Sequence, residues 1–220
     1  MPRPPKTTKK RSAYHHGDLA AALVAEALRV VEAQGHEAVS VREVARAAGV
    51  SAGAPFRHFR DRDDLLRAVS LAGARRLVAL LDKAVAEAGD DPLLQFRAIG
   101  LAQIRFALKH PNLQRLMQAP GMNEPPSTAT DEDRALVATL LGRARALVEA
   151  AQREGTMRAG DPAVYELAGV ALVHGLSQLF LEGQLPRKGA EELAEAVLDA
   201  LGKGLGRGAR AASVLRESGS

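Results

Sequence analysis

Apolar residues recur every three to four positions through most of the chain, which is the spacing of one face of an α-helix. No stretch alternates apolar and polar residues in the manner of a β-strand. The pattern therefore predicts an all-α chain. Capping residues, prolines and glycines place its helices at about 18–34, 41–48, 52–59, 61–88, 92–109, 112–117, 131–154, 162–182 and 189–205.

Residues 40–66 predict two short helices around a tight turn, followed by a longer third helix. Ser40 and Glu43 have the spacing of a capping box, Gly49 suits a left-handed helix end, and Ser51 can cap the next helix. This arrangement is a helix-turn-helix, a shape that fits the major groove of DNA. Many helical hairpins with a glycine turn never contact DNA, so the spacing alone does not decide the function.

Small and basic residues around this helix pair favour DNA. Ala52, Gly53 and Ala54 leave the start of the second helix unobstructed, so its backbone can approach another surface closely. Positive side chains at helix starts and in a flexible arm suit phosphate contacts. They are Arg42, Arg46, Arg57 and Arg62 around the pair, and Arg3, Lys6, Lys9, Lys10 and Arg11 in an arm with no acidic residue before Asp18.

The segment 17–66 resembles the DNA-binding domain of the TetR (tetracycline-repressor) family of bacterial transcription regulators. The resemblance rests on the run VREVARAAGVS at positions 41–51, on Phe56-Arg57-His58-Phe59, and on Arg62 with Leu65-Leu66. The family usually has Tyr where this chain has Phe56, so one phosphate hydrogen bond is lost. It usually has Lys where this chain has Arg62, which keeps the positive charge.

The resemblance implies a role for each matching residue. Arg57 and the open backbone at Ala52, Gly53 and Ala54 would face base edges, and Arg42 could reach a guanine. The remaining members of the set would position the domain on the phosphates or pack beside them, and the arm would enter the minor groove or act as an electrostatic tether. These members are Ser40, Ser51, Phe56, His58 and Arg62, with Lys9, Lys10 and Arg11 in the arm.

The distribution of charge agrees with a DNA-binding N-terminal quarter. The chain of 220 residues carries 30 Lys and Arg against 26 Asp and Glu, and the first 60 residues hold ten basic and five acidic side chains. The rest of the chain is therefore nearly balanced, which suits a nucleic-acid module joined to a neutral body. A uniformly basic chain would instead have favoured a non-specific coating protein.

The sequence divides into four parts: a basic arm (1–16), a helix-turn-helix domain (17–66), a helical domain (67–206) and a flexible tail (207–220). The family resemblance implies that the helical domain binds a ligand and dimerises. Residues 118–130 are rich in Pro, Ser and Thr and predict a loop, with disorder as an alternative. The chain has no Cys and no apolar run of the signal-peptide kind, so we expect a cytoplasmic location without a membrane span.

The segment 163–181 is apolar nearly all round, with small residues that allow close helix packing. Such a helix is either wholly internal or shared with a partner chain. The family resemblance implies that the last two helices pair with their symmetry mates in a homodimer. Two reading helices would then reach major-groove faces about 34 Å apart, so the expected partner is a pseudo-palindromic double-stranded operator.

His174 is the most informative polar residue of the C-terminal part. The run Val173-His174-Gly175 resembles a subclass pattern W-x-x-x-H-G, although Val170 replaces the Trp. His174 is either buried and bonded to a carbonyl, to Gln103 or to Gln178, or it is a polar anchor in a ligand pocket. The candidate pocket residues are Phe96, Gln103, Phe106, Met117, Leu172, His174 and Gln178, and the effector is an unknown small molecule.

The sequence thus predicts a ligand-responsive transcription regulator, most simply a repressor. An activator of the same fold and a non-specific architectural DNA-binding protein are the alternatives, and a protein-interaction module is a further one. An enzyme is disfavoured because no nucleophile–base pair, phosphate-binding loop or HExxH motif is present. Adjacent His15 and His16 lack a third ligand, so we predict neither a metal nor a cofactor.

Overall fold

The computed structural model describes residues 19–205, which form an all-α fold with no β-strand in that range. The small N-terminal domain, here called the head, comprises α1 (Leu19–Gln34), η1 (His36–Ala38), α2 (Val41–Ala47), η2 (Pro55–Arg57) and the first turns of α3 (Arg62–Glu87). The larger domain, here called the body, contains the rest of α3 with α4 (Pro92–Lys109), α5 (Pro111–Gln118), α6 (Asp131–Arg153), α7 (Pro162–Leu181) and α8 (Ala190–Leu205). The expected fold class is confirmed.

The head is held by a small core and by well-defined helix ends. Leu23 and Val31 of α1 pack with Val44 of α2 and Leu65 of α3, and all four are fully or almost fully buried. Ser40 Oγ accepts a 3.5 Å hydrogen bond from the Glu43 amide, as half of a capping box does. The turn after α2 passes through Gly49 at φ +72°, a backbone angle that residues with a side chain rarely adopt.

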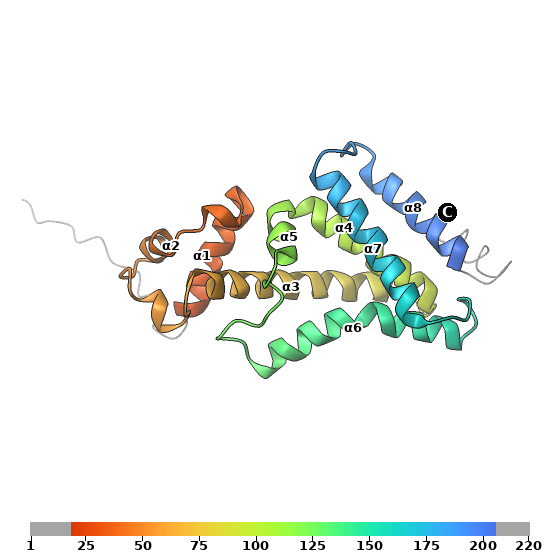
Figure 1. Ribbon diagram of the computed structural model, residues 1–220, viewed down its shortest axis with the longest axis horizontal. Coiled ribbons are helices and arrows are strands. Elements are labelled where there is room, and N and C mark those ends of the chain that lie inside the picture. Colours follow the sequence, from red (N-terminus) through yellow and green to blue (C-terminus); the bar gives the residue numbers. More distant parts are fainter. Residues whose placement is uncertain (1–18, 206–220) are drawn as a thin grey trace, which may run out of the picture.

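One long helix joins the head to the body. The α3 helix starts at the N-cap Asp61, whose side chain accepts from the Asp64 amide over 2.7 Å. Its first turns pack inside the head, and its later turns lie along the middle of the body beside α4 and α6 (Figure 1). Because a helix transmits a rotation along its whole length, this element couples the two domains mechanically.

The body is built in two layers around α4. The inner layer packs α4 against α3, α5 and α6 and shares a continuous apolar core with the head. The outer layer packs the other face of α4 against α7 and α8, through a second cluster that includes Ile104, Leu176, Phe180 and Ala194 (Figure 1). The start of α4 at Asp91-Pro92 and that of α7 at Asp161-Pro162 follow the predicted caps.

The α7 helix keeps an exposed apolar face after folding. Gly169, Val173 and Phe180 pack inward, whereas Val164 and Leu167 on the opposite face are 60% and 67% exposed. Within residues 19–205, α7 is the single helix long and apolar enough to cross a membrane by length and composition. In this fold its inward face packs against α4 and α6, as the face of a core helix does.

The loop predicted at 118–130 is confirmed and is anchored to the head. Residues 119–130 leave α5 beside the body and return toward the start of α3 before α6 begins (Figure 1). Pro126 is buried, and Ser127 bonds to residues of the head. The alternative of disorder is therefore wrong for this segment, because a buried carboxylate of the head fixes it.

Candidate nucleic-acid interface and ligand cavity

The second helix of the helix-turn-helix differs from its prediction. We expected an α-helix over 52–59, but the segment consists of turns and the single 3-10 turn η2. Pro55 has no amide hydrogen and cannot bond back to Ser51, so the first helical hydrogen bond is missing. The Ser51 carbonyl instead accepts from the Ala54 amide over 3.0 Å. The predicted Ser51 side-chain cap is also wrong, because η2 begins after Ala54, which has no side-chain acceptor.

Most of the residues expected to face DNA are exposed in the head. Gly53 has open space where a side chain would project, and Phe56, at 55% exposure, is an exposed aromatic ring beside Arg57. Ala54 and Ser40 are half-buried, and the arm residues Lys9, Lys10 and Arg11 lie outside the described residues. The exposed members are Arg42, Ser51, Ala52, Gly53, Phe56, Arg57 and His58.

Arg62 is occupied by contacts inside the head. Its Nε donates to the Val39 carbonyl over 3.0 Å and its Nη2 to the His36 carbonyl over 2.6 Å. Both acceptors lie in the connection between α1 and α2. Arg62 therefore fixes the orientation of that connection relative to α3, a role that the phosphate assignment from sequence did not include.

A buried carboxylate, Asp64, organises the start of α3. It accepts from the Arg60 amide over 3.0 Å, from Arg60 Nη2 over 3.1 Å and from Arg67 Nη2 over 3.4 Å. It also accepts from the amide of Ser127 over 2.9 Å and from the Ser127 hydroxyl. Burial alone would raise the pKa of Asp64, but the hydrogen bonds from Arg60 and Ser127 outweigh it and hold that pKa well below its usual range.

The Ser127 hydroxyl also donates to the His58 carbonyl over 3.3 Å. Ser127 thus links the loop of the body to the residue that directly follows η2. A second head–body contact is formed by Glu32 of α1, which pairs with Arg76 of α3 at 2.7 Å and with His110 before α5 at 3.2 Å. Sequence periodicity could not find either link, because the partners are far apart in the chain.

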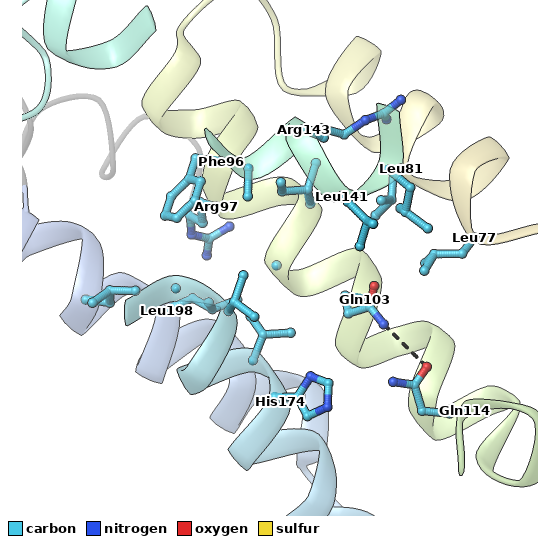
Figure 2. Close-up of a pocket in the computed structure, with 18 of the residues that line it drawn as sticks. Leu77, Leu81, Phe96, Arg97, Gln103, Gln114, Leu141, Arg143, His174 and Leu198 are labelled. Atoms are coloured by element: carbon cyan, nitrogen blue, oxygen red, sulfur yellow. Dashed lines mark hydrogen bonds between the residues drawn. The ribbon is translucent and has the colours of Figure 1, made fainter. Parts of the chain in front are cut away.

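The body contains a partly open cavity of about 280 Å³ between α3, α4, α5, α6, α7 and α8. Its wall is mainly aliphatic and aromatic, with a polar group of glutamines at the α5 side (Figure 2). Glycines shape two parts of this wall. A Cβ at Gly169 would lie 2.5 Å from the Phe96 ring, and one at Gly100 would lie 3.2 Å from Val173 and Leu198.

Four of the predicted pocket residues line this cavity: Phe96, Gln103, Met117 and His174. Phe106 is buried in the core against the His110 ring, Leu172 packs in the outer cluster, and Gln178 bonds to Gln118 outside the wall. None of these three side chains is part of the cavity wall. His174 is exposed at the cavity wall, so the alternative of a buried histidine is wrong.

Several polar residues of the cavity wall were not predicted from the sequence. Gln114 and Gln118 lie one turn apart on α5, and Gln103 Nε2 donates to Gln114 Oε1 over 3.3 Å (Figure 2). Arg97 and Arg143 also line the cavity. The i, i+4 spacing of Gln114 and Gln118, opposite Gln103 on the preceding helix, was the available signal.

Each cavity arginine is paired with a carboxylate. Arg97 Nε lies 2.5 Å from Asp199 Oδ1 of α8, and Arg143 Nη2 lies 2.5 Å from Asp82 Oδ1 of α3. Within residues 19–205 no group of three His, Asp or Glu side chains is placed to hold a metal ion. The mainly apolar wall suits the site to holding an apolar molecule.

Comparisons with known proteins match both domains. Residues 23–69 match the family model described as bacterial regulatory proteins, tetR family, and residues 96–201 match a tetracyclin repressor-like C-terminal domain. No curated protein was found to match. The W-x-x-x-H-G subclass stays a prediction.

Solved structures share the fold over most of the chain. A protein of unknown function from Rhodococcus sp. RHA1 is 33% identical, with a TM-score of 0.73 over 89% of this chain and 98% of that one. The TetR family transcriptional regulator PfmR from Thermus thermophilus is 27% identical, with a TM-score of 0.58 over 84% and 96%.

A third structure, AibR in complex with isovaleryl coenzyme A and operator DNA, is 17% identical, with a TM-score of 0.56 over 82% and 96% of the two chains. The helix-turn-helix head, the all-helical body and the two family matches lead to one conclusion. The chain belongs to the TetR family of bacterial transcription regulators, which are not enzymes.

Proposed function

We propose that the protein is a homodimeric transcriptional repressor that a small molecule releases from a pseudo-palindromic operator. One observation carries the proposal: α3 bears the head at its start and the cavity wall near its end. Leu65 and Leu66 of α3 lie in the core of the head, and Leu77 and Leu81 of the same helix line the cavity. A molecule that moves the later turns of α3 must therefore move the head.

This arrangement supports the proposed domain boundaries. Residues 17–66 form the DNA-binding unit and 67–206 the ligand-binding and dimerisation unit, with the arm at 1–16 and the tail at 207–220 on either side. The protein acts in the cytoplasm, where its operator is.

In the proposed complex, Arg57 and Arg42 read bases, and the open backbone around Gly53 allows a close approach. The exposure of all three residues supports this assignment. Ser40, Ser51 and His58 position the head on phosphates, together with Lys9, Lys10 and Arg11 of the arm. Ala52, Ala54 and Phe56 form the apolar part of the same surface. Arg62 holds the α1–α2 connection, in addition to the phosphate role expected from sequence.

The dimer forms through α7 and α8. Val164, Leu167 and Val170 of α7 are exposed on one face, and Leu193 of α8 adds to the exposed apolar surface. A contiguous apolar surface of this kind is typical of a protein interface. Pairing two chains here sets the spacing of the two heads, so each operator half-site is read by one chain.

Two routes connect the cavity to the head. The first is α3 itself. The second starts at Met117 and Gln118, which line the cavity at the end of α5, and continues through the loop to Ser127 on Asp64 and the His58 carbonyl. A ligand that displaces the end of α5 therefore acts on the reading segment through a short path.

Fluorescence anisotropy tests the proposal with the protein on its own upstream intergenic DNA and on a shuffled duplex, near physiological salt. We expect a clear preference for the native fragment, and Arg57→Ala should reduce it by about 1–3 kcal/mol. Arg134→Ala, an exposed arginine on α6, is the control and should leave the preference unchanged. Equal, salt-sensitive binding of the wild type to both duplexes would instead favour the architectural protein.

Transcription from the adjacent promoter separates a repressor from an activator. Adding the protein to a purified transcription reaction should lower the yield of transcript from the native fragment. An increase would assign the protein as an activator of the same fold.

A further inference from the structure

Two hydrogen bonds between glutamine side chains fix the amide directions at one end of the cavity. Gln103 Nε2 donates to Gln114 Oε1 over 3.3 Å, and Gln178 Nε2 donates to Gln118 Oε1 over 2.9 Å. Gln114 and Gln118 therefore accept through their oxygens and keep their NH₂ groups as donors. Both residues line the cavity from one face of α5.

One of these donors is buried and has no acceptor. Gln118 Nε2 is buried without a hydrogen-bond partner within residues 19–205. Such a group is unfavourable, because it has given up its hydrogen bonds to water and gained none in the protein. A ligand atom that accepts from this amide removes that cost, so this end of the cavity selects for an acceptor.

The charges of the wall argue against an anionic ligand. The two arginines of the wall, Arg97 and Arg143, are each held by a carboxylate at 2.5 Å. A ligand carboxylate would lose its hydration shell in an apolar cavity and would have to compete for an arginine already paired. An uncharged acceptor avoids both costs.

The volume indicates the size of the part of a ligand that the cavity can hold. At a protein-like packing density of about 0.74, the cavity of about 280 Å³ leaves roughly 200 Å³ for ligand atoms. This corresponds to about twelve carbon and oxygen atoms. The aliphatic wall formed by Leu77, Leu81, Ile99 and Leu140 suits an alkyl chain or a small ring.

We propose that the cavity binds an uncharged, mainly apolar molecule of about twelve non-hydrogen atoms whose carbonyl oxygen accepts from Gln118. Ketones, esters and lactones belong to this class. The inference rests on the proposed function for the site, and it adds the chemical class of the effector.

Isothermal titration calorimetry on the full-length protein tests the class with two probes of equal heavy-atom number, 2-undecanone and decanoate. We expect the ketone to bind at least about tenfold more tightly than the carboxylate at neutral pH. Equal or tighter binding of decanoate would overturn the inference, as would failure of the ketone to bind.

Substitution of the donor tests the orientation of the ligand. Gln118→Leu should weaken 2-undecanone binding about tenfold, because the ketone oxygen loses the hydrogen bond that the buried Gln118 amide donates. Gln184→Leu makes the same change at an exposed position after α7 and should leave binding unchanged. Unchanged affinity in Gln118→Leu would contradict the acceptor contact.

Infrared spectroscopy of the wild-type complex makes the test independent of variant folding. The carbonyl stretch of bound 2-undecanone should shift to a lower frequency than in hexane, as hydrogen-bonded carbonyls do. A hexane-like frequency in the complex would contradict the contact.

DNA binding separates this inference from the proposed function. If 2-undecanone binds but leaves the operator complex intact, the ligand class stands and release by this ligand class fails. If decanoate alone releases the operator, ligand release stands and the uncharged class is wrong.

Discussion

The head and the body are stabilised by different kinds of contact. In the head, a small apolar core is supplemented by polar anchors such as Asp64 and Arg62, which bond to backbone groups as well as to side chains. In the body, long helices pack through apolar surfaces around a cavity, and one residue of its wall, Gln118, has a buried donor without a partner within residues 19–205. Polar anchors fix one geometry, whereas an incompletely filled core can change its packing when a ligand enters. The difference predicts a rigid DNA-binding head joined to a body whose packing can change.

The largest effect on stability is expected when the Asp64 carboxylate is removed from the head. Asp64→Ala leaves Arg67, whose side chain is 13% exposed, without its buried partner and releases Ser127. We expect the free energy of unfolding to fall by about 3–5 kcal/mol, as for other broken buried ion pairs. Asp63→Ala, at an exposed neighbouring position, should have little effect. Urea denaturation followed by circular dichroism measures both, and equal losses would contradict the role of Asp64.

The next largest effect is expected from a substitution in the proposed dimer interface of the body. Leu167→Glu puts a charge on a side chain that is 67% exposed in one chain, so the monomer should fold normally. The dimer should dissociate, and operator affinity should fall about a hundredfold because the second head is no longer tethered. Sedimentation velocity and anisotropy measure the two changes. Ala138→Glu, on the exposed side of α6, is the control, and an intact dimer in Leu167→Glu would contradict the assigned interface.

A smaller loss of stability is expected at acidic pH, and it should arise from the buried carboxylates Asp64 and Asp133. The pKa of Asp64 is lowered below its unfolded value near 3.9, and the pKa of Asp133 is also lowered, against the effect of burial, by bonds from Thr130 and Arg75. Each carboxylate therefore contributes stability that is present above about pH 4 and is lost as the pH falls toward its folded pKa. The loss is at most about 1.4 kcal/mol per pH unit for each group.

Asp64→Asn tests this slope. Urea titrations at several acidic pH values should give a shallower loss of stability in the variant than in the wild type. Parallel curves would show that Asp64 does not titrate differently in the folded and unfolded states.

The smallest effect is expected from a substitution that tests the contact between the loop and the head. Ser127→Ala removes the hydroxyl that bonds to Asp64 and to the His58 carbonyl, which should cost about 1 kcal/mol of stability. If the loop transmits ligand binding, the variant should also need more ligand for the same release of DNA. Thr128→Ala, at the adjacent exposed position, should behave as the wild type. An unchanged ligand response in Ser127→Ala would leave α3 as the sole route.

Local rules predicted the helix boundaries well, since caps and helix ends depend on residues within one turn. Asp61, Asp91 and Asp161 cap the expected helices, and Gly49 and Gly155 end others at positive φ. The short reading helix was predicted wrongly because the missing amide of Pro55 was given too little weight. Side-chain partners distant in sequence could not be predicted, as with Asp64 and Ser127.

The candidate cavity was predicted in part for a similar reason. Phe96, Gln103, Met117 and His174 line it, but the rotation of each helix about its axis decides which side chains face inward. Periodicity identifies an apolar face and does not say whether that face meets another helix or a void. Phe106 and Leu172 accordingly pack in the core.

The glycines around the cavity make its ligand preference easy to change during evolution. A single methyl group at Gly169 would press on the Phe96 ring, one at Gly73 would meet the Met117 sulfur at 2.7 Å, and one at Gly100 would meet Val173 and Leu198. Each substitution alters the shape of the void and leaves the reading segment untouched. Descendants of this gene could therefore acquire new effectors one mutation at a time while keeping the same operator.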